Sequence, residues 1–159
     1  MNIPDITLII TNWNGRELLR ECLPSILKSV AYDKKRSYEI MVVDDCSSDD
    51  SLEVLAREFP TVRAEKTPVN YGFHGANNFG AGLARSRLIM PMNNDIKLDE
   101  EALYHLAEHF DKGKHTNTHG RGICVLPVCR IVNEREHWVH TGQDRPLQSP
   151  KYVVRNSYL

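Results

Sequence analysis

Ile6-Thr7-Leu8-Ile9-Ile10 is a short, apolar and largely β-branched run near the start of the chain, and such a run is typical of a strand buried on both faces of a sheet. Asn14-Gly15 then interrupts it. From Leu18 to Leu27 apolar residues recur at three- and four-residue spacing, which predicts a helix. Pro24 lies inside that pattern, so it either kinks the helix or divides it in two. A strand followed directly by a helix indicates the first repeat of an α/β fold.

Three more segments have the composition of strands, and helical patterns lie between them. These strands are predicted at residues 38–43, 61–64 and 88–92. Regular alternation of strands and helices favours parallel pairing, because each helix returns the chain to the same end of the sheet. The sequence therefore predicts an α/β fold with a mostly parallel sheet and helices on both of its faces.

The predicted helices differ in the strength of their patterns. The second helix is capped by Ser48 or Asp49, whose side chains accept hydrogen bonds from free backbone N–H groups. Residues 76–85 have helical spacing, although Gly80 and Gly82 each weaken a helix by about 1 kcal/mol relative to alanine. The apolar face of the second helix is predicted at Leu52, Leu55, Ala56 and Phe59. A fourth helix is predicted to open near residue 99, and its apolar face comprises Leu103, Leu106, Ala107 and Phe110.

The pattern weakens after Lys112. We predict a loop over 114–121, a strand over 123–128, a hairpin over 130–139, a loop over 143–150 and an apolar segment at 152–154. We expect one domain over residues 1–159 that is truncated at its C-terminus.

Composition excludes several classes of protein. Of 159 residues, 41% are hydrophobic and 26% charged, with a net charge of −1, which does not suit a dedicated nucleic-acid or membrane-surface binder. Cys22, Cys46, Cys124 and Cys129 form no C-x-x-C pair, so we expect free thiols. The N-terminal pattern is not that of a signal peptide, and no apolar run reaches the roughly 18 residues that span a bilayer. We expect a cytoplasmic protein, at most peripheral to the inner face of a membrane.

Polar clusters follow three of the predicted strands. They are Thr11-Asn12-Trp13-Asn14, Asp44-Asp45 and Asn93-Asn94-Asp95. In an open parallel sheet, ligands bind beyond the carboxyl ends of the strands, where these clusters should meet. The sequence therefore predicts a ligand site at this edge.

The chemistry of the clusters indicates a nucleoside diphosphate held with a metal ion. No glycine-rich phosphate loop follows the first strand, so a diphosphate must be neutralised in another way, and a divalent cation held by a carboxylate is one means of doing so. Asp95 suits Mg²⁺ or Mn²⁺, the alternative being a turn aspartate. Trp13 offers a face for a nucleobase, the alternative being a rim aromatic. Asp44 and Asp45 suit hydrogen bonds from base or ribose, the alternative being loop capping.

The order of these motifs resembles the family 2 glycosyltransferases of GT-A fold, over about residues 6–110. The resemblance rests on Thr7 to Gly15, Val42 to Asp49, Asn70 to Asn78 and Met92 to Asp95. The third of these blocks is similar to bacterial rhamnosyltransferase-like members that build surface polysaccharides. The family implies transfer of a sugar, with inversion, from a nucleotide-sugar donor to a saccharide or lipid-linked acceptor.

The resemblance also implies roles for individual residues. Thr11 and Trp13 would contact the base. Asp45, with Asp44 beside it, would form hydrogen bonds to the nucleoside. Asn93 would lie near the ribose. Asp95 matches the metal-binding end of the family's D-x-D motif, from which Asn93 and Asn94 depart by being uncharged. The full set of predicted nucleotide-sugar contacts is Thr11, Trp13, Asn14, Asp44, Asp45, Asn70, Gly72, Phe73, Asn78 and Asn93.

No residue is assigned as the catalytic base that the family supplies from a later acidic motif. Glu134, Glu136 and Asp144 are expected to be solvated surface residues. Histidines at 105, 109, 115 and 119 lack a third ligand for a metal and are also expected at the surface. The acceptor-binding part is expected to be missing.

Two other functions are compatible with these residues. The first is a truncated or degenerate module that binds the donor without turnover, which the uncharged Asn93 and Asn94 favour. The second is a receiver-like signalling domain with Asp44 or Asp45 as phosphoacceptor. It is disfavoured because Cys129-Arg130, and no lysine, follows the predicted strand at 123–128.

Overall fold

A computed structural model of the chain describes residues 3–86, 88–111, 130–132, 138–139 and 153–154. The chain forms two compact units. The first contains residues up to Leu23 together with Lys34–Asn94, and the second contains Pro24–Asp33 and the chain from Asp95 onward. No helix among the described ranges combines the length and the apolar character needed to cross a membrane.

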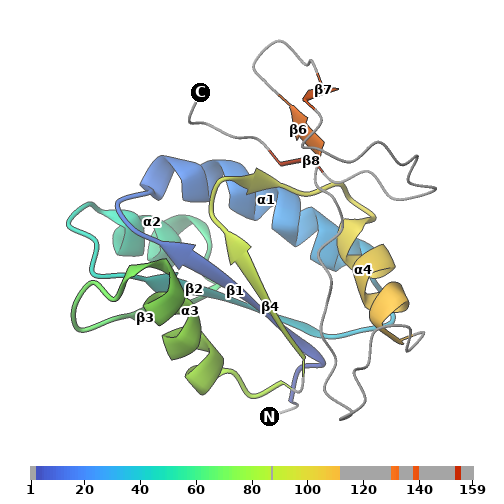
Figure 1. Ribbon diagram of the computed structural model, residues 1–159, viewed down its shortest axis with the longest axis horizontal. Helices are drawn as coiled ribbons and strands as arrows, with labels where there is room; N and C mark the ends of the chain where they lie inside the picture. The colour runs from blue at the N-terminus through green and yellow to red at the C-terminus, as the bar shows by residue number, and fades with distance from the viewer. Residues whose placement is uncertain (1–2, 87, 112–129, 133–137, 140–152, 155–159) are drawn as a thin grey trace. The chain divides into compact units, whose positions relative to one another are not determined.

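A four-stranded parallel sheet forms the centre of the first unit (Figure 1). Its strands are β1 (Ile6–Asn12), β2 (Tyr38–Asp44), β3 (Arg63–Lys66) and β4 (Leu88–Asn93), in the order β3-β2-β1-β4. Each neighbouring pair is parallel, which confirms the predicted α/β fold. The third strand begins two residues later than predicted, because Val62 donates its N–H to Phe59 in a turn after the preceding helix.

Both faces of this sheet are buried. On one face Ile9, Met41 and Val43 pack around Ala76 of helix α3 (Gly72–Leu83). Since side chains alternate along a strand, Leu8 and Ile10 point to the opposite face, and they too are fully buried. Central β1 is buried along its whole length, as its continuous apolar run predicted.

Gly80 explains why α3 persists despite its glycines. A Cβ at this position would stand 2.8 Å from Cγ2 of both Ile9 and Val43. The missing side chain lets the helix approach the strands closely, and that packing offsets the low helix propensity of glycine.

Helix α1 (Arg16–Tyr32) continues through Pro24, so of the two outcomes predicted for this proline, a kink or a division, the division does not occur. The buried face formed by Leu19, Leu23 and Ile26 continues on both sides of the proline, which is itself exposed. Burial of one continuous apolar face outweighs the backbone hydrogen bond that proline removes.

Helix α2 (Ser51–Glu58) buries Val54 and Leu55, whereas Ala56, which was predicted to face inward, is exposed. The helix begins one residue later than a cap at Asp49 would give, with Asp50 at its N-cap. Ser48 does not cap it. Asp49 does accept hydrogen bonds from the N–H and hydroxyl of Ser51.

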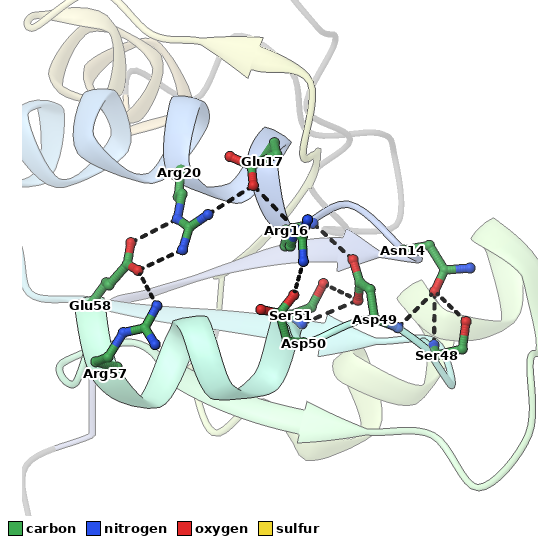
Figure 2. Close-up of polar contacts among 10 residues, drawn as sticks. All are labelled: Asn14, Arg16, Glu17, Arg20, Ser48, Asp49, Asp50, Ser51, Arg57 and Glu58. Atoms are coloured by element: carbon green, nitrogen blue, oxygen red, sulfur yellow. Dashed lines mark hydrogen bonds and ion pairs between the residues drawn. The ribbon is translucent and has the colours of Figure 1, made fainter.

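Charged side chains join α1 to α2 at the surface (Figure 2). Arg20 donates to both carboxylate oxygens of Glu58, at 2.9 and 2.8 Å. Arg16 donates to Asp50 at 2.7 Å. We call Arg16, Glu17, Arg20, Asp50, Arg57 and Glu58 the surface ion network.

The second unit contains helix α4 (Ala102–Asp111) and the strands β5 (Ile96–Lys97), β6 (Arg130–Val132), β7 (Trp138–Val139) and β8 (Val153–Val154). The strands form a sheet in the order β5-β8-β6-β7. The antiparallel pair β6–β7 matches the hairpin predicted over 130–139. The predictions for 114–121, 123–128 and 143–150 lie outside the described residues.

Hydroxyl groups on α1 fix the start of α4. Ser25 accepts from the N–H of Leu98, and Ser29 accepts from the N–H of Leu103. The N–H of Leu103 lies in the first turn of α4 and has no partner within the helix, so Ser29 satisfies it, while Ser25 holds the segment before the helix. Leu103 and Ala107 are buried as predicted, while Leu106 and Phe110 are half-buried.

Candidate functional site

The carboxyl ends of three adjacent strands bring the predicted polar clusters of the first unit together. Asn12 at the end of β1 is in register with Asp44 at the end of β2. Thr11 is in register with Asn93 at the end of β4. The prediction that these clusters share one edge of the sheet is thereby confirmed.

Asn12 is the centre of a buried hydrogen-bond network at this edge. Its Nδ2 donates to Oδ2 of Asp44 at 3.1 Å, and its Oδ1 accepts from Nδ2 of Asn94 at 2.8 Å. Asp44 is fully buried, and its Oδ1 accepts from the N–H of Ser47 at 3.0 Å. We call Asn12, Asp44, Ser47 and Asn94 the strand-end network. It joins β1, β2 and β4 through neutral amides and one carboxylate.

The loop after β2 is held against the loop after β1. The hydroxyl of Ser47 accepts from the N–H of Asn14 at 2.9 Å. In return, Oδ1 of Asn14 accepts from the N–H groups of Ser48 and Asp49 (Figure 2). Asn14 and Cys46 both have positive φ, 48° and 59°, a conformation that asparagine adopts more readily than most residues. These bonds fix the backbone on either side of Trp13.

Asp45 joins the end of β2 to the segment before α3. Its Oδ1 accepts from the hydroxyl of Thr67 at 2.9 Å and from the N–H of Tyr71 at 2.8 Å. Asn70 donates to the carbonyl of Asp45 and accepts from the N–H of Gly72, which has φ of 70°. Oδ1 is the acceptor in both of these hydrogen bonds. Asp45 thus fixes the loop through Oδ1, and Oδ2 takes no part in these two bonds.

Three aromatic side chains of the first unit are unusually exposed. Trp13 is 62% exposed, Phe73 52% and Tyr71 46%. Large aromatic residues normally bury most of their surface. Trp13 and Phe73 were predicted to contact the donor, whereas Tyr71 was not. Tyr71 directly precedes the predicted contacts Gly72 and Phe73 in the sequence, and that position was the signal that could have identified it.

The other predicted contacts of this unit differ in exposure. Asn78 and Asn93 are exposed, and Thr11 is buried. Asn12, Ser47 and Asn94 were absent from the predicted site residues. A polar amide at the end of an otherwise apolar strand was the available signal for Asn12.

Asp95 lies in the second unit, one peptide bond after Asn94. Its Oδ1 is buried and has no hydrogen-bond partner. A buried carboxylate oxygen without a donor is costly unless a cation or water satisfies it. Within the described residues no three acidic, histidine or cysteine side chains form a cluster able to hold a metal. Asp95 thus supplies one buried carboxylate oxygen of the kind that suits a hard cation such as Mg²⁺.

Of the histidines expected at the surface, His105 on α4 has a described side chain. His105 lies 3.2 Å from Glu101 and is part-exposed. That contact, followed by one with Tyr32, lowers the pKa of Glu101. The side chains of His109, His115 and His119 lie outside the described part of the structure, as do Glu134, Glu136 and Asp144. Cys22 and Cys46 are free thiols, while Cys124 and Cys129 are not among the described residues.

Comparison with known sequences identifies relatives. The sequence pattern of a family described as "Glycosyl transferase family 2" matches residues 7–151. The chain is 30% identical over 129 residues to a poly(ribitol-phosphate) beta-glucosyltransferase of Bacillus spizizenii, covering 74% of this chain and 20% of that enzyme. It is 30% identical over 110 residues to the succinoglycan biosynthesis protein ExoO of Rhizobium meliloti, covering 69% of this chain and 30% of that protein. The chain thus spans less than a third of either relative.

Solved structures share the fold. S. aureus TarS 1–349 in complex with UDP-GlcNAc superposes with a TM-score of 0.59 at 23% identity, over 75% of this chain and 36% of that one. The mannosyltransferase PcManGT from Pyrobaculum calidifontis in complex with GDP-Man and Mn²⁺ gives 0.57 at 20% identity, over 68% and 32%. These likenesses confirm the GT-A-like fold.

Proposed function

The chain belongs to glycosyl transferase family 2, and on that premise we propose that it binds a nucleoside-diphosphate sugar and takes part in transferring the sugar to a saccharide or lipid-linked acceptor, with inversion at the anomeric carbon. The observation that carries the proposal is the meeting of the β1, β2 and β4 ends in one polar edge. That edge is where open parallel sheets bind ligands.

The nucleoside would lie against the loops after β1 and β2. Trp13 offers an exposed ring face for a base, and the backbone around it is held by Asn14 and Ser47. Asp45 retains Oδ2 for a hydroxyl or base N–H. Asp44 has both oxygens bonded and is fully buried. We therefore propose that Asp44 supports the loop, with Thr11 and Asn70 contributing beside it.

The sugar and ribose would be contacted by exposed amides and by the segment that starts α3. Asn93 and Asn78 present side chains able both to donate and to accept hydrogen bonds, which suits sugar hydroxyls. Gly72 and Phe73 are the first two residues of α3, and Phe73 is exposed. The resemblance of this block to rhamnosyltransferase-like members remains a proposal, since neither relative named above is one.

Asp95 is the proposed ligand of a divalent cation, Mg²⁺ or Mn²⁺. Its unpartnered buried oxygen supports this role. A bound cation would neutralise the diphosphate and so ease its departure as a leaving group. With a single carboxylate, we expect metal affinity to depend strongly on the nucleotide, because phosphate oxygens must complete the coordination.

The relatives suggest the biological process in which we propose that this chain acts. Those named above act in the synthesis of poly(ribitol-phosphate) glycosides and succinoglycan, so we propose a part in bacterial surface polysaccharide synthesis. A cytoplasmic location, where nucleotide sugars and reduced thiols are available, belongs to the same proposal.

Isothermal titration calorimetry tests donor binding. UDP, GDP and dTDP are titrated into the chain with Mn²⁺, with Mg²⁺ and with chelator. We expect at least one nucleotide to bind only with metal. Asp95→Asn, which keeps the shape and removes the charge, should weaken this binding about 10- to 100-fold. Glu53→Gln on α2 removes a charge in another element and should have no effect. Absence of metal-dependent binding by the wild type would overturn the proposal.

A turnover assay separates the enzyme from the binding module. If nucleotide binds but no donor is hydrolysed or transferred by this polypeptide, the donor-binding alternative is supported. Release of nucleoside diphosphate from a nucleotide sugar, lost in Asp95→Asn, would exclude that alternative.

A further inference from the structure

We infer that Asn94 is a positioning residue of the donor site, and that an uncharged amide at this position is required by the direction of the hydrogen bonds in the strand-end network. The inference rests on the proposed function for its effect on ligand binding. The hydrogen-bond direction itself is independent of that function.

Each bond in the network fixes the direction of the next. The N–H of Ser47 can only donate, and it donates to Oδ1 of Asp44. The ionised carboxylate can only accept, so Asn12 must turn its Nδ2 toward Oδ2 of Asp44. The Oδ1 of Asn12 then faces Asn94 and requires a donor. Nδ2 of Asn94 supplies it at 2.8 Å.

A carboxylate at position 94 would reverse the last bond. Its oxygens would face Oδ1 of Asn12, placing two acceptors together. Turning the Asn12 amide over would relieve that contact, but it would then place Oδ1 of Asn12 against Asp44. One acceptor pair remains in either case. An acidic residue is therefore excluded at 94 as long as position 44 is acidic.

Gly15 provides the space for this bond. A Cβ built on Gly15 would stand 2.5 Å from Nδ2 of Asn94 and 2.6 Å from Oδ1 of Asn12. These are the two atoms of the bond itself. Because Gly15 does not have positive φ, its requirement is for space rather than for backbone freedom. The absence of a side chain at Gly15 thus leaves room for the hydrogen bond between Asn12 and Asn94.

The consequence for function follows from connectivity. Asn94 is half-buried and directed at Asn12, while the preceding residue, Asn93, is exposed. The proposed ribose contact and the proposed metal ligand, Asp95, are its two neighbours in the chain. The Asn12–Asn94 bond therefore fixes the backbone between them, and loosening it should weaken binding of a metal–nucleotide pair without removing a ligand.

The test is a double-mutant cycle between positions 94 and 44. Asn94→Asp should lower the melting temperature and weaken metal-dependent nucleotide binding by about 10- to 100-fold, as loss of a supporting residue around a metal typically does. Asp44→Asn alone is the reference of the cycle: its amide oxygen still accepts from Ser47 and the amides of Asn12 and Asn94 can turn over, and whatever loss it causes by itself is subtracted before the coupling between the two positions is read. In the double variant the chain of bonds runs in reverse, so most of the loss should be recovered.

Two further variants control the interpretation. Asn93→Asp adds the same charge one residue away, and Asp44→Asn should not alter its effect. Gly15→Ala should reproduce the loss seen in Asn94→Asp, but Asp44→Asn should not rescue it, since the added methyl group blocks the bond in either direction.

The readouts separate the two proposals. If the wild type binds no nucleotide with metal, the proposed function fails, and melting temperatures still test the bond direction. Failure of Asp44→Asn to restore the stability of Asn94→Asp would overturn the inference. So would rescue of Gly15→Ala by Asp44→Asn.

Discussion

The strand-end network and the surface ion network both join elements that are distant in sequence, but they do so with different chemistry. The strand-end network is buried and consists mainly of neutral amide and hydroxyl groups around Asp44. The surface ion network consists of arginines and carboxylates whose side chains are one-third to two-thirds exposed. Water can replace the partners of the second network but not those of the first.

This difference teaches where the chain tolerates change. A buried polar group that loses its partner keeps its full desolvation cost, so the strand-end network depends on the donor or acceptor character of each atom. Exposed ion pairs can exchange their partners for water, and salt screens them. We therefore expect loss of function from small changes at strand ends and only small shifts in stability from large changes on α1 and α2.

The largest expected effect is from Asn12→Ala. This change leaves Asp44 and Asn94 without their buried partner, so the free energy of unfolding should fall by about 2 kcal/mol. Urea unfolding measures it, with exposed Asn78→Ala as control. The loss should persist at high salt. Equal losses in the two variants would show that Asn12 is not the centre of a buried network.

A smaller effect is expected from Arg20→Ala, which removes the paired bonds to Glu58. Its melting temperature should fall slightly below that of the wild type at low salt. The gap should close at about 1 M NaCl, where the screening length is about 3 Å. Arg57→Ala, which removes a single bond to Glu58, should cost less. A gap that is unchanged by salt would contradict the comparison.

The smallest effect concerns pH. Hydrogen bonds from Arg20, then Arg57, lower the pKa of Glu58 from 4.5 to about 2. Because the folded pKa is depressed, the stabilisation is present above pH 4.5 and lost as pH falls toward 2. The melting-temperature gap between wild type and Glu58→Gln should therefore close over that interval. A gap that stays constant down to pH 2 would show that no ion pair is involved.

The strands of the first unit and their parallel direction were largely predictable from sequence, because a β-branched run buried on both faces leaves few alternatives, but their order β3-β2-β1-β4 was not predicted. Boundaries set by tertiary bonds were not predictable. Helical spacing predicted a start at residue 76, yet α3 begins at Gly72, since Asp45 and Asn70 hold the N–H groups of Tyr71 and Gly72. The start of α4 at Ala102 likewise depends on Ser29 of α1.

The candidate site was predictable in position but less so in its parts. The polar residues that follow β1, β2 and β4 in the sequence indicated which edge of the sheet holds the candidate site. The sequence did not distinguish Asp44, which is fully buried and bonded through both oxygens, from Asp45, which keeps one oxygen out of its bonds. Neighbouring residues in a chain point in different directions, and only the packing around them decides which of their carboxylate oxygens are already bonded.

By itself, the sequence determined the parallel α/β sheet, the family and the edge at which a donor would bind, because periodicity and motif order are properties of the chain alone. The tertiary structure decided which polar residues support the site and which are available to a ligand. Hydrogen bonds have direction and burial has a cost, so the roles of Asn12, Asn94 and Gly15 became visible only when residues from three strand ends were brought together.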